Sequence, residues 1–280
     1  MLVIGGGPAG LMAAKRAALS GADVILCDEG VRLGGRLLSE RLAVDGVSGS
    51  DWAEDVSEEL AAMENVRIMT RTAVTGAYDQ GMFGALERLS PEVAQRRGAP
   101  RACFWRIVAE RSILAAGAIE RPIAFRNNDR PGIMMASAVR TYVNRYAVAP
   151  GCSVAVFGNT DEAHRTAADL LAAGVHVSAL IDARHHATCT LDVPFFAGAH
   201  VSDAEGRKEL EAISVSRASG SDKIRADCLA MSGGWNPSVH LTCHMNGWPR
   251  WNADLAAFVP APGISPPMRA LRLVWRRLLL

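Results

Sequence analysis

The amino-acid sequence predicts an α/β protein: a Rossmann-like FAD/NAD(P)-binding domain with a second, inserted nucleotide-binding-like domain. Three observations support this prediction. The chain opens with a strand, a glycine-rich loop, a helix, a second strand and an acid, which is the order of a dinucleotide-binding unit. The same order of elements begins again near residue 154. The 280 residues, 49% of them hydrophobic, provide enough chain for two modest domains with buried cores.

The first unit begins with an apolar strand at residues 2–4, a glycine-rich loop and a helical pattern over residues 11–19. In the spacing GxGxxG, the first glycine makes a tight turn, the second lets the backbone approach a pyrophosphate, and the third lets helix and strand pack closely. The helix N-terminus then offers unpaired amides and a positive dipole to the anion. The candidate cofactor-binding residues of this loop are Gly5, Gly7, Pro8, Ala9 and Gly10.

A second apolar strand at residues 24–27 ends in Asp28 and Glu29. An acid about 20 residues after the glycine loop is the residue type that accepts hydrogen bonds from the ribose hydroxyls of an adenosine. Asp28 is the first candidate for this role and Glu29 the second. A carboxylate here repels a 2′-phosphate, which favours NAD or FAD over NADP, although Arg32 and Arg36 lie nearby. The choice between NAD and FAD stays open.

Two further glycine-containing turns follow. The pair Gly34-Gly35, with Arg36, comes just after the acid, and a strand at residues 112–114 leads into a second turn. Together these segments resemble the flavoproteins and pyridine-nucleotide oxidoreductases that have two dinucleotide-binding domains. In that family a glycine pair lies beside the adenylate, and a strand and turn of this kind mark the chain's crossing between domains. The further candidate cofactor-binding residues are Gly34, Gly35, Arg36, Ala116 and Gly117.

Residues 228–237 look like a second crossing, back to the first domain. We therefore expect the FAD/NAD-binding domain to comprise residues 1–120 and 225–259. The inserted Rossmann-like domain is expected at residues 121–224, and residues 260–280 form an atypical tail.

The inserted domain repeats the architecture of the first but not its glycines. Gly158 opens the loop, whereas Thr160 and Ala163 stand at the later glycine positions, and Asp161 and Glu162 add negative charge where a phosphate would bind. A purely structural domain is favoured, and whether this unit holds a ligand stays open.

Longer segments narrow the resemblance. The chain resembles the α subunits of heterotetrameric sarcosine oxidases from residue 2 to about residue 259, and more distantly those of opine oxidases, hydrogen cyanide synthases and related amine dehydrogenases. The segments that carry this resemblance are residues 104–107, 113–134, 138–146, 159–167, 206–208 and 232–241.

The resemblance implies a dinucleotide-binding, NAD-holding subunit of a heteromeric flavoenzyme that oxidises sarcosine to glycine, with formaldehyde and hydrogen peroxide as co-products. It further implies β, γ and δ partner subunits, with FAD and FMN in the assembled complex and a small amine as substrate. No catalytic residue carries over, and we expect an oxidoreductase subunit that is inactive alone. The alternatives are a stand-alone FAD/NAD-dependent reductase, an α-type subunit of an opine oxidase or amine dehydrogenase, and a degraded fragment that binds nothing.

The ends of the chain depart from the pattern of that family. Its α subunits are longer, with a ferredoxin-like segment before the first nucleotide-binding strand and a folate-binding aminomethyltransferase-like domain after this region. Residues 260–280 do not resemble the family, and four arginines interleave with leucines there. A truncated or frame-shifted end accounts for this tail better than an amphipathic membrane or calmodulin-binding helix, because its charges fall on no single face.

Composition excludes other classes of protein. With 30 Lys and Arg against 29 Asp and Glu, the chain lacks the basic surplus of a nucleic-acid or membrane-surface protein. Its six cysteines form no CxxC pair, and His240 and His244 have no third ligand nearby, so no metal site is predicted and reduced thiols in the cytoplasm are expected. Tyr142 and Tyr146 are expected to pack on a helix face, and Trp235, Trp248 and Trp251 to pack in a core or a subunit interface.

Overall fold

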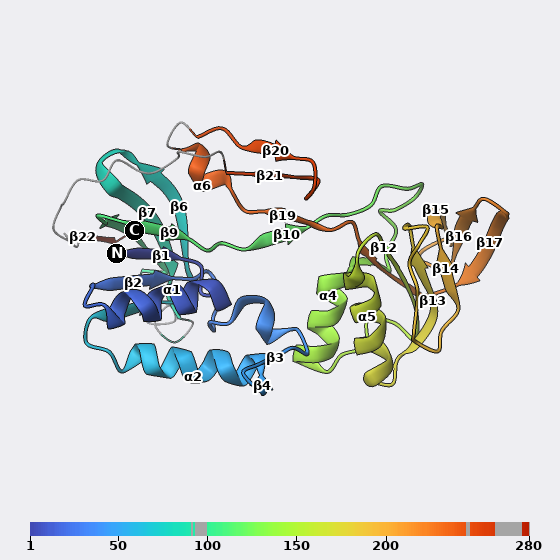
Figure 1. The fold of residues 1–280 in the computed structure, drawn as a ribbon, viewed down its shortest axis with the longest axis horizontal. Helices are drawn as coiled ribbons and strands as arrows, with labels where there is room; N and C mark the ends of the chain where they lie inside the picture. Colours follow the sequence, from blue (N-terminus) through green and yellow to red (C-terminus); the bar gives the residue numbers. More distant parts are fainter. Residues whose placement is uncertain (91, 93–99, 245–246, 261–275, 280) are drawn as a thin grey trace. The chain divides into compact units, whose positions relative to one another are not determined.

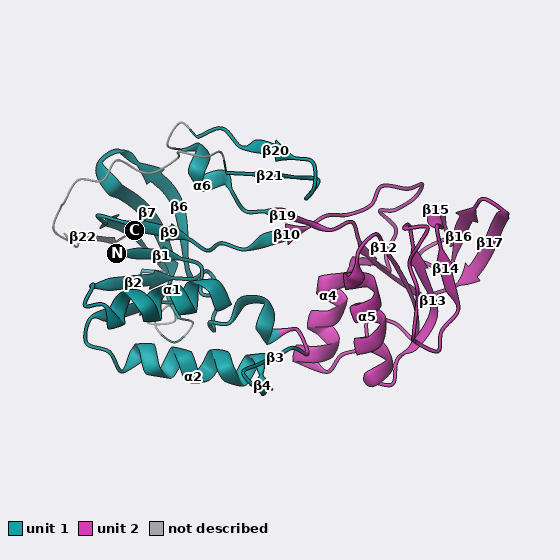
Figure 2. Ribbon diagram, viewed as in Figure 1, with its two compact units in different colours: residues 1–38, 42–118, 237–280 teal, residues 39–41, 119–236 magenta. Residues whose placement is uncertain are grey.

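The computed structural model describes residues 1–90, 92, 100–244, 247–260 and 276–279. The chain divides into two compact units, which Figure 2 shows in different colours. Unit 1 comprises residues 1–38, 42–118 and 237–280, and unit 2 comprises residues 39–41 and 119–236. Each unit has helices on one face of a parallel sheet and an antiparallel sheet on the other. This arrangement agrees with the predicted α/β class.

Unit 1 is built on a parallel sheet of four strands, in the order β5-β2-β1-β9 (Figure 1). The two inner strands, β1 and β2, are short and fully buried, as expected for parallel strands that are covered on both faces. The chain crosses from β1 to β2 through helix α1, and helix α2 precedes β5. The bounds are β1 Leu2–Ile4, α1 Pro8–Leu19, β2 Val24–Cys27, α2 Gly49–Ala61, β5 Val66–Met69 and β9 Ser112–Leu114.

Alternation along β1 assigns its side chains to two cores. Val3 packs with Leu11 of α1 on the helix side, whereas Leu2 and Ile4 pack with Phe83 on the side of the antiparallel sheet. A strand places successive side chains on opposite faces, so three apolar residues in a row serve both cores. Packing on both faces fixes β1, and with it the start of the glycine loop.

Unit 2 has a parallel sheet of five strands, in the order β11-β18-β12-β13-β14. Helices α4 and α5 pack on one face, and the antiparallel strands β15, β16 and β17 pack on the other. The bounds are β11 Ile133–Met135, α4 Ala136–Arg140, β12 Ser153–Gly158, α5 Asp161–Ala172, β13 His176–Asp182, β14 Phe195–Ala197, β15 His200–Glu205, β16 Ala212–Arg217, β17 Gly220–Arg225 and β18 Cys228–Ser232. A π-helical turn, η3, follows α4 at Thr141–Arg145.

The other elements are short, apart from the antiparallel strands of unit 1. They are η1 Gly35–Leu38, β3 Ala43–Val44, β4 Val47–Ser48, β6 Thr72–Tyr78, η2 Asp79–Gly81, β7 Met82–Arg88, β8 Ala102–Val108, β10 Ala118–Glu120, β19 Trp235–Pro237, α6 His240–Cys243, β20 Arg250–Asn252, β21 Ala257–Val259 and β22 Arg276–Leu279. Strands β22, β8, β7 and β6 form the antiparallel sheet of unit 1, and the crossing strands β10 and β19 pair with each other.

The second crossing lies further along the chain than the sequence indicates. The predicted inserted domain ends at residue 224, whereas unit 2 extends to residue 236 because β18 pairs with β11 and β12 of that unit. Strand β18 is therefore an interior strand of the second sheet, between β11 and β12, and not the first strand of the return to unit 1. The chain re-enters unit 1 at Pro237.

The exposed fractions of four aromatic side chains bear on two expectations from the sequence. Tyr142 and Tyr146 are 44% and 57% exposed, so a large part of each side chain does not pack against the rest of the chain. Trp248 and Trp251, at 82% and 53% exposed, lie outside any core. In the described ranges, no helix is both long enough and apolar enough to cross a bilayer. Most of the atypical tail, residues 261–275 and 280, lies outside the described residues.

Candidate functional site

Two of the three motif glycines in the loop after β1 are required by its geometry. Gly5 has a φ of +103°, and a Cβ there would overlap the carbonyl oxygen of Ala115. A Cβ on Gly10 would overlap the carbonyl oxygen of Gly5. The loop therefore packs main chain against main chain, and no side chain fits at these positions.

Gly7 differs because its side-chain position is open. A Cβ built on Gly7 meets no heavy atom within 4 Å, so packing within the chain does not require glycine there. Gly7 is the N-cap of α1, Pro8 occupies the first helical turn, no side chain caps the helix, and the first turn contains no acid. The helix N-terminus therefore has an open position at Gly7, no capping side chain and no acidic residue in its first turn. This arrangement suits a phosphate.

Asp28 fixes the loop and keeps capacity for a ligand. Its Oδ2 accepts a hydrogen bond from the Gly6 amide at 2.6 Å, and its Oδ1 accepts one from the Gly30 amide at 2.7 Å. Each carboxylate oxygen has a second lone pair, and the side chain is only partly buried, so further donors can bind. The neighbouring Glu29 is exposed. Asp28 is thus the acid that the fold connects to the glycine loop.

The second glycine pair lies directly against the first loop. The Gly34 amide donates a hydrogen bond to the Gly6 carbonyl at 2.8 Å, and a Cβ on Gly35 would lie 3.0 Å from Cα of Gly7. Both residues of the pair have positive φ angles. Arg36 is exposed in the turn η1, which follows. The chain thus brings together two segments that are some 30 residues apart in sequence.

The turn after β9 forms the third side of the site. The Ala115 amide donates to the Ile4 carbonyl at 2.7 Å, which continues the sheet to the start of the loop. Ala116 and Gly117 follow, and Gly117 has a φ of +66°. All twelve predicted cofactor-binding residues lie in unit 1, on three segments that meet at the carboxyl ends of β1, β2 and β9. Ligands of parallel α/β sheets bind at this edge.

Sequence reasoning missed three residues of this site. The Gly6 amide binds Asp28, a Leu33 methyl group packs where a Gly6 side chain would lie, and the Ala115 carbonyl limits Gly5 to glycine. The run of three consecutive glycines was the available signal for Gly6. Nothing local in the sequence distinguishes Ala115 from its neighbours.

Metal-ligating and thiol side chains are alternative candidates for functional groups. Among the residues that the structure describes, no cluster of three or more His, Cys, Asp or Glu side chains is arranged to hold a metal ion. Burial raises the pKa of the Cys27 thiol to about 12, and burial likewise raises the pKa of Cys228 to about 12. These two thiols stay protonated at neutral pH and are poor nucleophiles.

Residues 1–257 match the family described as pyridine nucleotide-disulphide oxidoreductase. The chain belongs to this family. Its α/β dinucleotide-binding fold is accordingly that of the family, as the sequence predicted. The solved structures of two oxidoreductases have the same fold. L-proline dehydrogenase from P. horikoshii is 22% identical, with a TM-score of 0.68 over 93% of this chain and 46% of that one. Thioredoxin reductase from T. acidophilum is 17% identical, with a TM-score of 0.67 over 90% of this chain and 81% of that one.

Relatives of higher identity belong to oxidases of several subunits. The α subunit of the sarcosine oxidase of Rhizobium meliloti (strain 1021) is 46% identical over 94% of this chain and 27% of its own length. The corresponding protein of Corynebacterium sp. (strain U-96) is 38% identical over 95% of this chain and 29% of its own. One subunit of the opine oxidase of Rhizobium meliloti (strain 1021) is 30% identical over 65% of this chain and 38% of its own length. The resemblance to sarcosine oxidase α subunits is thereby confirmed, and the chain spans less than a third of their length.

Proposed function

We propose that this chain is the dinucleotide-holding part of an α-type subunit of a heteromeric flavoenzyme that oxidises a secondary amine. The 46% identity to a sarcosine oxidase α subunit over nearly the whole chain supports the subunit class. The observation that carries the proposal is the open position at Gly7, in front of a helix N-terminus that has no capping side chain. Backbone amides and the helix dipole would stabilise a diphosphate there without a cationic side chain.

The adenosine side of the site favours NAD or FAD over NADP, and we propose NAD, with FAD as the alternative. Asp28 would accept hydrogen bonds from ribose hydroxyls and would repel a 2′-phosphate. Of the two nearby arginines, Arg32 lies 3.1 Å from the Glu54 carboxylate, which reduces its availability for a phosphate. When bound, NAD would supply a nicotinamide ring capable of hydride transfer. The residues described here only bind and orient the nucleotide.

The oxidation itself belongs to the assembled complex in this proposal. Sarcosine is the substrate, glycine, formaldehyde and hydrogen peroxide are the products, and β, γ and δ partners with FAD and FMN complete the enzyme. The names of the relatives of higher identity support this choice, and opine oxidase remains the second candidate because one of its subunits is 30% identical. A stand-alone disulfide reductase is less well supported, since it needs a reactive cysteine pair. The six cysteines form no CxxC pair in the sequence, and two of them, Cys27 and Cys228, are buried thiols with a raised pKa.

The test begins with the purified full chain. After denaturation, the released small molecule should have the mass of NAD and no flavin absorbance. A separate assay should detect no sarcosine-dependent peroxide from the chain alone, and peroxide should form once the partner subunits are co-expressed. Release of FAD would select the alternative cofactor, and turnover by the isolated chain would reject its role in a multi-subunit enzyme.

A further inference from the structure

Unit 2 contains the second place where a member of this family could bind a pyridine nucleotide. Strands β12 and β13 are parallel, and their register pairs Gly158 with Asp182. In unit 1, β1 and β2 pair in the same way up to Ile4 and Cys27, just before Gly5 and Asp28. Gly158 and Asp182 are therefore the counterparts of the first motif glycine and the ribose-binding acid.

The loop before α5 does not form a phosphate-binding site like the loop before α1. A Cβ on Gly158 would lie 2.8 Å from the Ala163 Cβ, so Ala163 fills the place of the third glycine. The first turn of α5 carries Asp161 and Glu162, whereas the first turn of α1 carries no acid. Thr160 Oγ1 is buried and, within the described part of the chain, has no hydrogen-bond partner, so it does not face an opening that a phosphate could enter. Two carboxylates at this helix N-terminus oppose a diphosphate.

Asp182 cannot act as Asp28 could. It is completely buried, and its Oδ1 accepts hydrogen bonds from the Arg184 amide at 2.9 Å and from Arg184 Nε at 3.0 Å. Its Oδ2 accepts from Arg184 Nη2 at 2.7 Å and lies 2.8 Å from His164 Nε2. Two partners on each oxygen use the full capacity of a carboxylate. No lone pair is left for a ribose hydroxyl.

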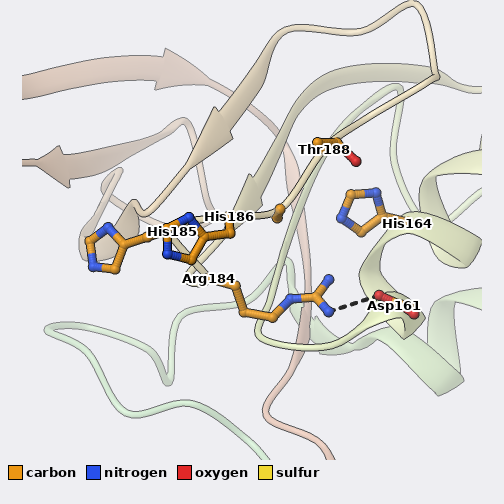
Figure 3. Close-up of a pocket in the computed structure, with 7 residues that line it drawn as sticks. Asp161, His164, Arg184, His185, His186 and Thr188 are labelled. Carbon is orange, nitrogen blue, oxygen red and sulfur yellow. Dashed lines mark ion pairs between the residues drawn. The ribbon is translucent and has the colours of Figure 1, made fainter.

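Arg184 connects this acid to the start of the helix. Its Nη1 lies 2.8 Å from Asp161 Oδ1 (Figure 3). Its Nη2 binds Asp182, so one guanidinium joins the end of β13 to the first turn of α5. A cavity of about 620 Å³ lies beside it, lined by Asp161 and His164 of α5 and by the loop 184–188. The positive charge of Arg184 is already matched by two carboxylates. Arg184 is therefore not available as an unmatched cation for a diphosphate in this cavity.

We infer that unit 2 binds no dinucleotide, because Arg184 occupies the acceptor oxygens of Asp182 and ties them to Asp161 in the first turn of α5. Unit 2 keeps the nucleotide-binding fold as a structural and assembly element. This inference goes beyond the proposed function and stands or falls separately from it.

Amide hydrogen exchange on the full chain tests the inference directly. The chain is incubated with NAD, NADP or FAD at millimolar concentration, and exchange is compared with that of the free protein. We expect slower exchange at residues 5–10 with NAD and no change at residues 158–164 with any of the three. Slower exchange at residues 158–164 would overturn the inference. No change in either segment would reject the proposed site in unit 1 and leave the inference intact.

Native mass spectrometry provides a second readout with a matched variant. Wild type should carry at most one dinucleotide per chain, and Gly7→Ala should carry none. Two dinucleotides on wild type would contradict the inference. A dinucleotide retained by Gly7→Ala together with protection at residues 158–164 would also contradict it.

Discussion

At the residue scale, Gly7 differs from the other motif glycines because the fold does not require glycine at this position. Gly5 and Gly10 contact neighbouring main chain where a Cβ would be, whereas Gly7 contacts nothing there and has a φ of −72° that alanine adopts freely. A methyl group at Gly7 would therefore project into the space assigned to the diphosphate. Alanine is a poorer N-cap residue than glycine, which lowers the stability of the fold. Alanine also lowers the conformational entropy of the unfolded chain, which raises it, and each effect is about 1 kcal/mol or less.

We predict that Gly7→Ala lowers affinity for NAD at least about tenfold, equivalent to about 1.4 kcal/mol, while the Tm stays close to that of wild type. Isothermal titration and thermal unfolding measure the two effects on the same preparation. Ser20→Ala, at the other end of α1, is the control and should bind as wild type does. Equal affinities of wild type and Gly7→Ala for NAD would contradict the assignment of the diphosphate to this loop.

Asp28 and Glu29 allow the choice of nucleotide to be tested. We predict that wild type prefers NAD to NADP and that Asp28→Asn weakens NAD binding about tenfold and reduces this preference, because the neutral amide no longer repels a 2′-phosphate. Titrations with both nucleotides measure the ratio. Glu29→Gln removes the exposed neighbouring charge and should leave the ratio unchanged. If the ratio of NAD to NADP affinity changed in Glu29→Gln and not in Asp28→Asn, the ribose contact would have to be assigned to Glu29 instead of Asp28.

At the element scale, the junction of β13 with α5 should respond to acid. Burial alone would raise the pKa of the Asp182 carboxyl, but hydrogen bonds from Arg184 and His164 outweigh burial and hold the pKa below its ordinary value. A lowered pKa in the folded state stabilises the fold above the ordinary pKa of about 4, and this stabilisation is lost as the pH falls through the lowered value.

We therefore predict that Asp182→Asn is less stable than wild type at pH 7 and that the difference shrinks as the pH falls from about 5 toward about 2. Urea unfolding at a series of pH values measures the free energy of unfolding of both proteins. A constant difference across this range would show that the Asp182 charge does not stabilise the fold.

The sequence predicted the elements around the site well because their signals are local. Strands β1 and β2 lie where the apolar runs placed them, and the glycine spacing identified the loop before α1. The pairing of strands has no comparable local pattern in the sequence. The pattern of β18 resembles a crossing strand, yet its hydrogen bonds are made with β11 and β12, which only the assembled sheet determines.

Contacts between distant residues account for the rest of what was missed. The role of Ala115 depends on its carbonyl facing Gly5, and that of Gly6 on its amide reaching Asp28. Tyr142 and Tyr146 are exposed beside a π-helical turn, and a 3.6-residue pattern does not describe such a turn. The ion pairs of Arg184 with Asp161 and Asp182 likewise join residues that no local sequence pattern connects.

At the scale of the whole molecule, two units of the same design have different chemistry at the same sheet edge. Unit 1 combines an uncapped helix N-terminus with an acid that retains acceptor capacity, and unit 2 combines a helix N-terminus carrying two acids with an acid that is fully used. The fold alone therefore does not determine where a nucleotide binds.

The most direct measurement of the central claim is a crystal structure of the chain grown with NAD. The account predicts that the diphosphate lies at the N-terminus of α1, beside Gly7, with a ribose hydroxyl hydrogen-bonded to Asp28. A diphosphate bound instead at α5, or a Gly7 loop whose opening is filled by protein side chains in the complex, would contradict it.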